Sequence, residues 1–160
     1  MFHIVQADLS LTKHAQAYLH LMSHYALDPM GGGQDLSHFA QQNLIQTLLK
    51  RNDIFIVLIF ADNKPAALLT AIEGFSTFAC KPLFNIHDVV VYQDFRRQGL
   101  TSLLFNKIEE IARTQDCCKL TLEVLEGNHV ARNAYGKLGY SDYVLDPALG
   151  GANFWTKSLT

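Results

Sequence analysis

The sequence predicts a mixed α/β fold in one domain over residues 1–160, and three observations support this expectation. The length is that of an average domain. Hydrophobic residues make up 49% of the chain and charged residues 18%, as in a compact rather than a disordered protein. Segments with helical spacing alternate with short β-branched runs, and no repeat or low-complexity linker separates them. We therefore expect one sizeable core.

The first two helices follow from apolar residues that recur every three or four positions, because such residues share one helix face. One helix is predicted over residues 11–26 and ends at a Pro- and Gly-rich stretch that begins at Asp28. The next helix is predicted over residues 36–50, with Asp35 as its N-cap.

Four strands are predicted before residue 92. A short strand is expected around Ile4, and residues 54–60 form a continuous run of β-branched and aromatic residues. A polar turn at residues 62–65 joins this run to a strand over residues 66–72, so the two read as a hairpin. A further strand is predicted over residues 85–91.

The second half of the chain alternates between apolar residues at helical spacing and short strand-like runs. From Gly99 the apolar residues take helical spacing, a strand follows over residues 119–124, and a helix is predicted over residues 129–138. Residues 140–145 and 154–159 are predicted to be closing strands.

Composition also excludes several classes of protein. Thirteen basic and fifteen acidic residues argue against nucleic acid as a partner. No apolar run approaches the length of a membrane span, and the N-terminus lacks the pattern of a secretory signal. We therefore expect a cytoplasmic protein without a membrane or nucleic-acid partner.

The cysteines and histidines favour a reduced protein without a metal. The three cysteines, Cys80, Cys117 and Cys118, are odd in number and form no C-x-x-C pair. His20 and His24 would share a helix face, but no third ligand lies nearby in the sequence. We expect no metal site.

The most informative segment is a strand, a basic loop and a glycine turn that leads into a helix. Helix N-termini present unpaired N–H groups and a partial positive charge, and Gly99 lets the backbone approach a ligand closely. Arg96 and Arg97 add positive charge, so the segment could bind a pyrophosphate. An ordinary connection with two solvated arginines explains the local sequence equally well.

Two motifs resemble the GNAT family of N-acetyltransferases. The segment R-R-Q-G-L-T at residues 96–101 resembles the family's R/Q-x-x-G-x-G/A signature, with Thr101 in the last small-residue position. The segment at residues 128–140 resembles the pattern N-x-x-A-x-x-x-Y-x-x-x-G-F/Y. The resemblance covers nearly the whole chain. It implies a mostly antiparallel central sheet with a splayed strand pair and about four flanking helices.

The resemblance implies that acetyl-CoA is the co-substrate. The backbone of Val89 and Val91 would pair with its pantetheine arm and acetyl carbonyl, and Asn128 would bind the same arm. The pyrophosphate would be held at the glycine turn, whose residues are Arg96, Arg97, Gln98, Gly99, Leu100, Thr101 and Ser102.

For catalysis the resemblance implies Tyr135 as the acid that protonates the leaving thiolate. A phenol with a pKa of about 10 carries its proton at neutral pH. Packing of Tyr135 on its helix face is the alternative. The base is open among Asp88, Glu123 and His87, and His87 and Asp88 could face one cleft only if the strand has a bulge.

The expected activity is transfer of an acetyl group to a primary amine by direct attack in a ternary complex. The acceptor would be a small molecule or a peptide, and a homodimer is a further expectation from the family. The leading alternative is a non-catalytic sensor that binds acyl-CoA. A hydrolase that uses Cys80 is a third hypothesis. The Gly31 to Gly33 loop would be either a flap over the acceptor or a surface loop.

Overall fold

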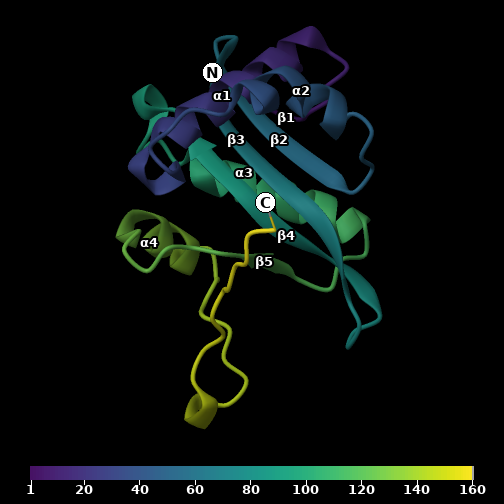
Figure 1. Ribbon diagram of the computed structural model, residues 1–160, viewed down its shortest axis with the longest axis vertical. Coiled ribbons are helices and arrows are strands. Elements are labelled where there is room, and N and C mark those ends of the chain that lie inside the picture. The colour runs from purple at the N-terminus through teal and green to yellow at the C-terminus, as the bar shows by residue number, and fades with distance from the viewer. Residues whose placement is uncertain (160) are drawn as a thin grey trace. The chain divides into compact units, whose positions relative to one another are not determined.

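The computed structural model describes residues 1–159, which form two compact units. The first unit runs from Met1 to Leu122, and the second begins at Glu123. In the described residues, the first contains a five-stranded sheet and three α-helices, and the second contains one α-helix and the C-terminal segment. Figure 1 traces these elements along the chain.

The sheet follows chain order, β1-β2-β3-β4-β5. Its first three neighbouring pairs are antiparallel, and β4 and β5 are parallel. The mixed α/β fold and the mostly antiparallel sheet predicted from the sequence are thereby confirmed. The strands are β1 (Phe2–Gln6), β2 (Ile54–Ala61), β3 (Lys64–Ser76), β4 (Lys81–Val91) and β5 (Leu120–Leu122).

Helices cover both faces of this sheet, which explains why β2 is apolar throughout and why β3 is buried without alternation from Ala66 to Ala71. Helices α1 (Thr12–Leu27) and α2 (His38–Leu48) lie in front of the sheet in Figure 1, and α3 (Leu100–Thr114) lies behind it. Tyr18 and Leu21 of α1 pack with Leu68 and Val90 in one core cluster. Fully buried side chains of α3 cover the other face, namely Leu104, Phe105 and Ile108.

The predicted helices and central strands are present, with shifted ends. β3 and β4 are longer than predicted because their hairpin extends to Ser76 and Lys81. The N-cap of α2 is Ser37, whose hydroxyl accepts from the Ala40 amide at 3.1 Å, so the assignment of Asp35 was wrong. Asp35 instead accepts from the next amide in the chain, that of Leu36.

The second unit contains α4 (His129–Lys137) as predicted, but not the two closing strands. Between residues 140 and 159 the β pairing consists of a single bridge, Val144 to Gly151. The prediction of strands over residues 140–145 and 154–159 was therefore wrong. Apolar spacing alone does not supply the partner strand on which a β-strand depends.

Candidate functional site

The edge of β4 is open along half of its length. The β4–β5 pairing ends at Ile86 and Leu122, while β4 continues to Val91. On its other side this part of β4 pairs with β3, where Val89 lies opposite Leu69 and Val91 opposite Ala67. The β5 side of Val89 and Val91 therefore lies beyond the paired region, where an extended ligand could bond to the main chain.

A β-bulge at His87 divides β4 into two parts. Thr70 of β3 lies opposite Asp88, whereas Ala71 lies opposite Ile86, so His87 is an extra residue. Directly opposed residues share a face, and neighbours along a strand point to opposite faces. Ile86 and Asp88 therefore face opposite sides of the sheet, and Asp88 shares with Thr70 the side covered by α1. The bulge that the sequence analysis set as a condition is present.

Asp88 is a partly buried carboxyl group among polar neighbours. Burial raises the pKa of Asp88 above its ordinary value, and the imidazole of His87 and a hydrogen bond with Thr70 oppose this rise. A carboxyl group whose pKa is raised toward neutrality is better suited to accept a proton from an amine than an exposed one. Asp88 thus combines a suitable environment with a position at the open edge.

His87 is less suited to the role of base. Its side chain is exposed, and its Nδ1 lies 3.3 Å from Oδ1 of Asn85. The effect of His87 on Asp88 is electrostatic, because an imidazole near a carboxylate favours the charged carboxylate.

The glycine turn has the backbone conformation expected at the start of a phosphate-binding helix. Gly99 is the N-cap of α3 and is left-handed, with a φ of 80°. A Cβ atom at Gly99 would meet no atom within 4 Å, so open space surrounds this face of the residue. The first-turn amides of α3, from Leu100 to Ser102, have no intrahelical acceptor because of their position. The turn therefore fits an anionic group such as a pyrophosphate.

The three polar side chains before Gly99 differ in their contacts. Arg96 donates from Nη2 to Oδ2 of Asp28 at 3.0 Å and from Nε to the Val91 carbonyl at 3.2 Å. Gln98 donates to the Asp94 carbonyl at 3.3 Å. Arg97 is exposed and left-handed, with a φ of 62°. Arg96 thus fastens the loop to the end of β4 and to the segment after α1, while Arg97 is accessible to a ligand.

The remaining predicted residues lie in the second unit. Glu123 is exposed and follows the end of β5. The prediction that it belongs to this strand was therefore wrong. Asn128 is the N-cap of α4, and its Oδ1 accepts from the Ala131 amide at 3.1 Å. Tyr135 is half-buried on α4, with its ring centroid 6.4 Å from that of Tyr140.

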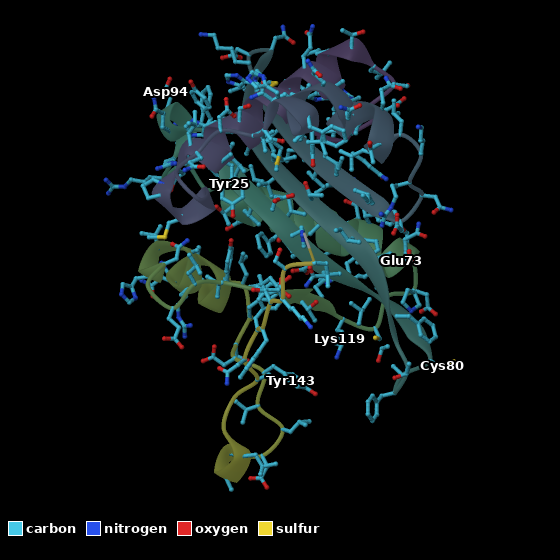
Figure 2. The ribbon with its side chains drawn as sticks, viewed as in Figure 1. Tyr25, Glu73, Cys80, Asp94, Lys119 and Tyr143 are labelled. Carbon is cyan, nitrogen blue, oxygen red and sulfur yellow. The ribbon has the colours of Figure 1, made fainter. Side chains whose placement is uncertain are left out.

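Cys80 and the pair His20 and His24 are the other candidates from the sequence. Figure 2 shows Cys80 at the tip of the β3–β4 hairpin, at the opposite end of the sheet from Tyr25 and Asp94. This cysteine is exposed. The imidazoles of His20 and His24 both lie against the ring of Tyr92, with centroid distances of 5.3 Å and 4.4 Å.

Within residues 1–159, no three His, Cys, Asp or Glu side chains form a group that could hold a metal ion. The helices of the same range are too short or too polar to cross a membrane.

The sequence analysis did not single out Thr70, Tyr18 or Asp28, although each of them is hydrogen-bonded to Asp88, Thr70 or Arg96. Thr70 is buried, and Tyr18 Oη lies 3.4 Å from its Oγ1. The available signal was a single threonine in the otherwise apolar run at residues 66–72. For Asp28 the sequence indicated only that a helix ends at this position, and gave no indication of its contact with Arg96.

Two comparisons relate the sequence to known proteins. The family model described as Acetyltransferase (GNAT) family matches residues 18–140. A thialysine N-epsilon-acetyltransferase from Bos taurus is 32% identical over 69 residues. This alignment spans 43% of the chain and 40% of the bovine protein, so less than half of either is compared.

Solved structures share the fold over nearly the whole chain. A probable acetyltransferase superposes with a TM-score of 0.81 at 21% identity, covering 99% of this chain and 98% of the other. A possible acetyltransferase from Clostridium difficile 630 gives 0.75 at 20% identity, covering 100% and 99%. AAC(6')-Iy in complex with a bisubstrate analogue, CoA-S-monomethyl-acetylneamine, gives 0.77 at 14% identity, covering 99% of each chain.

Proposed function

This chain belongs to the acetyltransferase (GNAT) family, and we propose that it transfers the acetyl group of acetyl-CoA to a primary amine by direct attack in a ternary complex. The observation that carries this proposal is the combination of an open β4 edge, a partly buried Asp88 on that same part of β4, and a left-handed glycine before α3. The edge and the glycine would hold the thioester donor, and Asp88 would deprotonate the amine that attacks it.

The first requirement is that the donor is held. The first-turn amides of α3, with Gly99 and the side chain of Arg97, would bind the pyrophosphate. The open edge of Val89 and Val91 would bond to the pantetheine arm, and Asn128 is proposed to bind the same arm. When bound, acetyl-CoA supplies an acetyl group activated as a thioester. Arg96 contributes by fixing the loop, since its guanidinium is already bonded to Asp28 and Val91.

The second requirement is an uncharged amine. A primary amine is mostly protonated at neutral pH, so a base must remove one proton before the nitrogen attacks. Asp88 is the base in this proposal, because it shares a face with Thr70 and its raised pKa makes it a better proton acceptor. His87 and Glu123 are less suited, since both side chains are exposed.

The third requirement is a proton for the leaving thiolate. Tyr135 is the proposed donor, on the strength of its position in the second motif and its place on α4. A phenol carries its proton throughout the neutral range.

The test is a panel of primary amines, including lysine analogues, polyamines, aminoglycosides and peptide N-termini, each assayed for release of free CoA thiol. We expect thiol release that depends on one class of amine and that is lost in the Asp88→Asn variant. Calorimetry with acetyl-CoA accompanies the panel. Absence of both acetyl-CoA binding and thiol release with every amine would overturn the proposal.

A further inference from the structure

We infer that Thr70, supported by Tyr18, is a positioning residue that orients the Asp88 carboxylate and keeps it ionised for proton removal. The inference deepens the proposed function and rests on Asp88 as the base. Thr70 and Tyr18 do not reach the reacting atoms in this scheme, and they act through Asp88.

The burial of Thr70 is the first step of the argument. Thr70 is 3% exposed and is the one polar residue among the buried residues of the described chain, 1–159. Its neighbours in β3, Leu69 and Ala71, are completely buried. A hydroxyl in such an environment is costly unless it is hydrogen-bonded. Its two partners, Tyr18 and Asp88, therefore account for its place in the core.

The positions of these partners follow from the fold. Asp88 lies directly opposite Thr70 in the β3–β4 pair, on the face that the His87 bulge gives it. Tyr18 reaches the same hydroxyl from α1, with Oη 3.4 Å from Oγ1, and its side chain is 2% exposed. Three elements thus converge on one hydroxyl group.

The number of protons fixes the direction of the hydrogen bonds. A threonine hydroxyl has one proton, and an ionised carboxylate can only accept. Thr70 therefore donates to Asp88 when Asp88 is charged, and Tyr18 donates to Thr70. Burial raises the pKa of Tyr18 to about 12, so its phenol keeps the proton that this chain of bonds needs. Both donors point toward the negative charge.

The groups that face Asp88 determine in which direction its pKa changes when the Thr70 hydroxyl is lost. His87 of β4 and Thr70 of β3 lower the pKa of Asp88 against the larger effect of burial. Tyr18 and Tyr25 of α1 lie close enough that the Asp88 charge raises the pKa of each phenol. Loss of the Thr70 hydroxyl removes one of the two groups that oppose burial. The pKa of Asp88 then rises further, and a higher pH is needed to ionise it.

The test compares Thr70→Val with Thr70→Ser in the full chain. Valine has nearly the same shape without the hydroxyl, and serine restores the hydroxyl. We expect the acid limb of kcat/KM against pH to move to higher pH in Thr70→Val, with a loss of about tenfold on that limb and little change on the alkaline plateau. Thr70→Ser should return the limb to the wild-type position.

Two further variants support the comparison. Tyr18→Phe should move the acid limb of the kcat/KM profile in the same direction by a smaller amount. This variant tests the inference if Thr70→Val does not fold. Thr114→Val is the matched control, because the Thr114 hydroxyl donates to the Ile111 carbonyl at 2.7 Å in α3, and its loss should leave the profile unchanged.

Carbon-13 NMR of the Asp88 carboxyl gives a readout without turnover, and its titration midpoint should rise in Thr70→Val. An unchanged midpoint and pH profile in that variant would overturn the inference. An equal loss of rate at every pH that serine does not restore would also overturn it, since it indicates a purely structural role. If Asp88→Asn keeps the wild-type rate, the proposed base is wrong, and the NMR titration still decides the link between Thr70 and Asp88.

Discussion

The conformation of Gly99 predicts that Gly99→Ala lowers stability and acetyl-CoA affinity for separate reasons. The φ of Gly99 is 80°, in the left-handed region, where a Cβ atom costs about 1–2 kcal/mol. A Cβ atom there would meet nothing within 4 Å, so neither a clash nor a new contact changes this figure. For a chain of this length, the melting temperature should fall by about 2–8 °C.

Thermal unfolding without ligand measures the first effect, and calorimetry with acetyl-CoA measures the second. The affinity should fall because the new methyl group projects into the open space where the pyrophosphate is proposed to bind. We expect a loss of at least about tenfold, which corresponds to roughly 1.4 kcal/mol.

Gly33→Ala is the matched control for backbone strain. Gly33 has a φ of 73°, and a Cβ atom added to it would likewise meet nothing within 4 Å, but it lies before α2. Its alanine variant should lose similar stability and keep wild-type acetyl-CoA affinity. An unchanged melting temperature in Gly99→Ala would refute the argument from backbone conformation. Unchanged affinity would refute the donor site.

Three further predictions concern single side chains. Asp88→Asn should abolish turnover and stabilise the fold. Because folding raises the pKa of Asp88, the contribution of its protonated form to stability is present below the unfolded pKa and is lost as the pH rises through the folded pKa. The free energies of unfolding of variant and wild type should therefore diverge as the pH increases through this range. Tyr135→Phe should lower kcat with nearly unchanged acetyl-CoA affinity in calorimetry; equal turnover would leave Tyr135 with a packing role. Cys80→Ser should leave thiol release unchanged, since Cys80 lies at the exposed hairpin tip, and inactivation would favour a cysteine nucleophile.

The sequence was sufficient for the elements whose signals are local. Helix α3 could be predicted because its apolar residues keep helical spacing from Leu100 onward, and β2 because residues 54–60 are uniformly apolar. The N-cap of α2 was misplaced by two residues because Asp35 and Ser37 are both good capping residues. The closing strands were wrong because pairing, unlike helix formation, depends on distant segments.

The turn at Gly99 that precedes α3 could be predicted, because Gly99 and its flanking residues are contiguous in the chain. The separate contacts of Arg96 and Arg97 could not be predicted, since the partner of Arg96 is Asp28, 68 residues earlier. The same is true of Thr70, whose partners come from α1 and β4. The pairing register of the strands and the packing of α1 bring these residues together, and neither can be predicted from the residues near Thr70 or Arg96 in the sequence.

The bulge at His87 has a consequence for how β4 should tolerate mutation. On one side of it, Phe84 and Ile86 are buried on one face of the sheet, and on the other side Asp88 and Val90 face the opposite way. In a saturation scan, even-numbered positions should be sensitive throughout the strand, but the phenotype should change at residue 87. Substitutions before it should reduce the amount of folded protein, whereas substitution of Asp88 should yield folded protein with altered activity. A single inserted residue thus separates Phe84 and Ile86, which the core requires, from Asp88, which is proposed to act in the reaction.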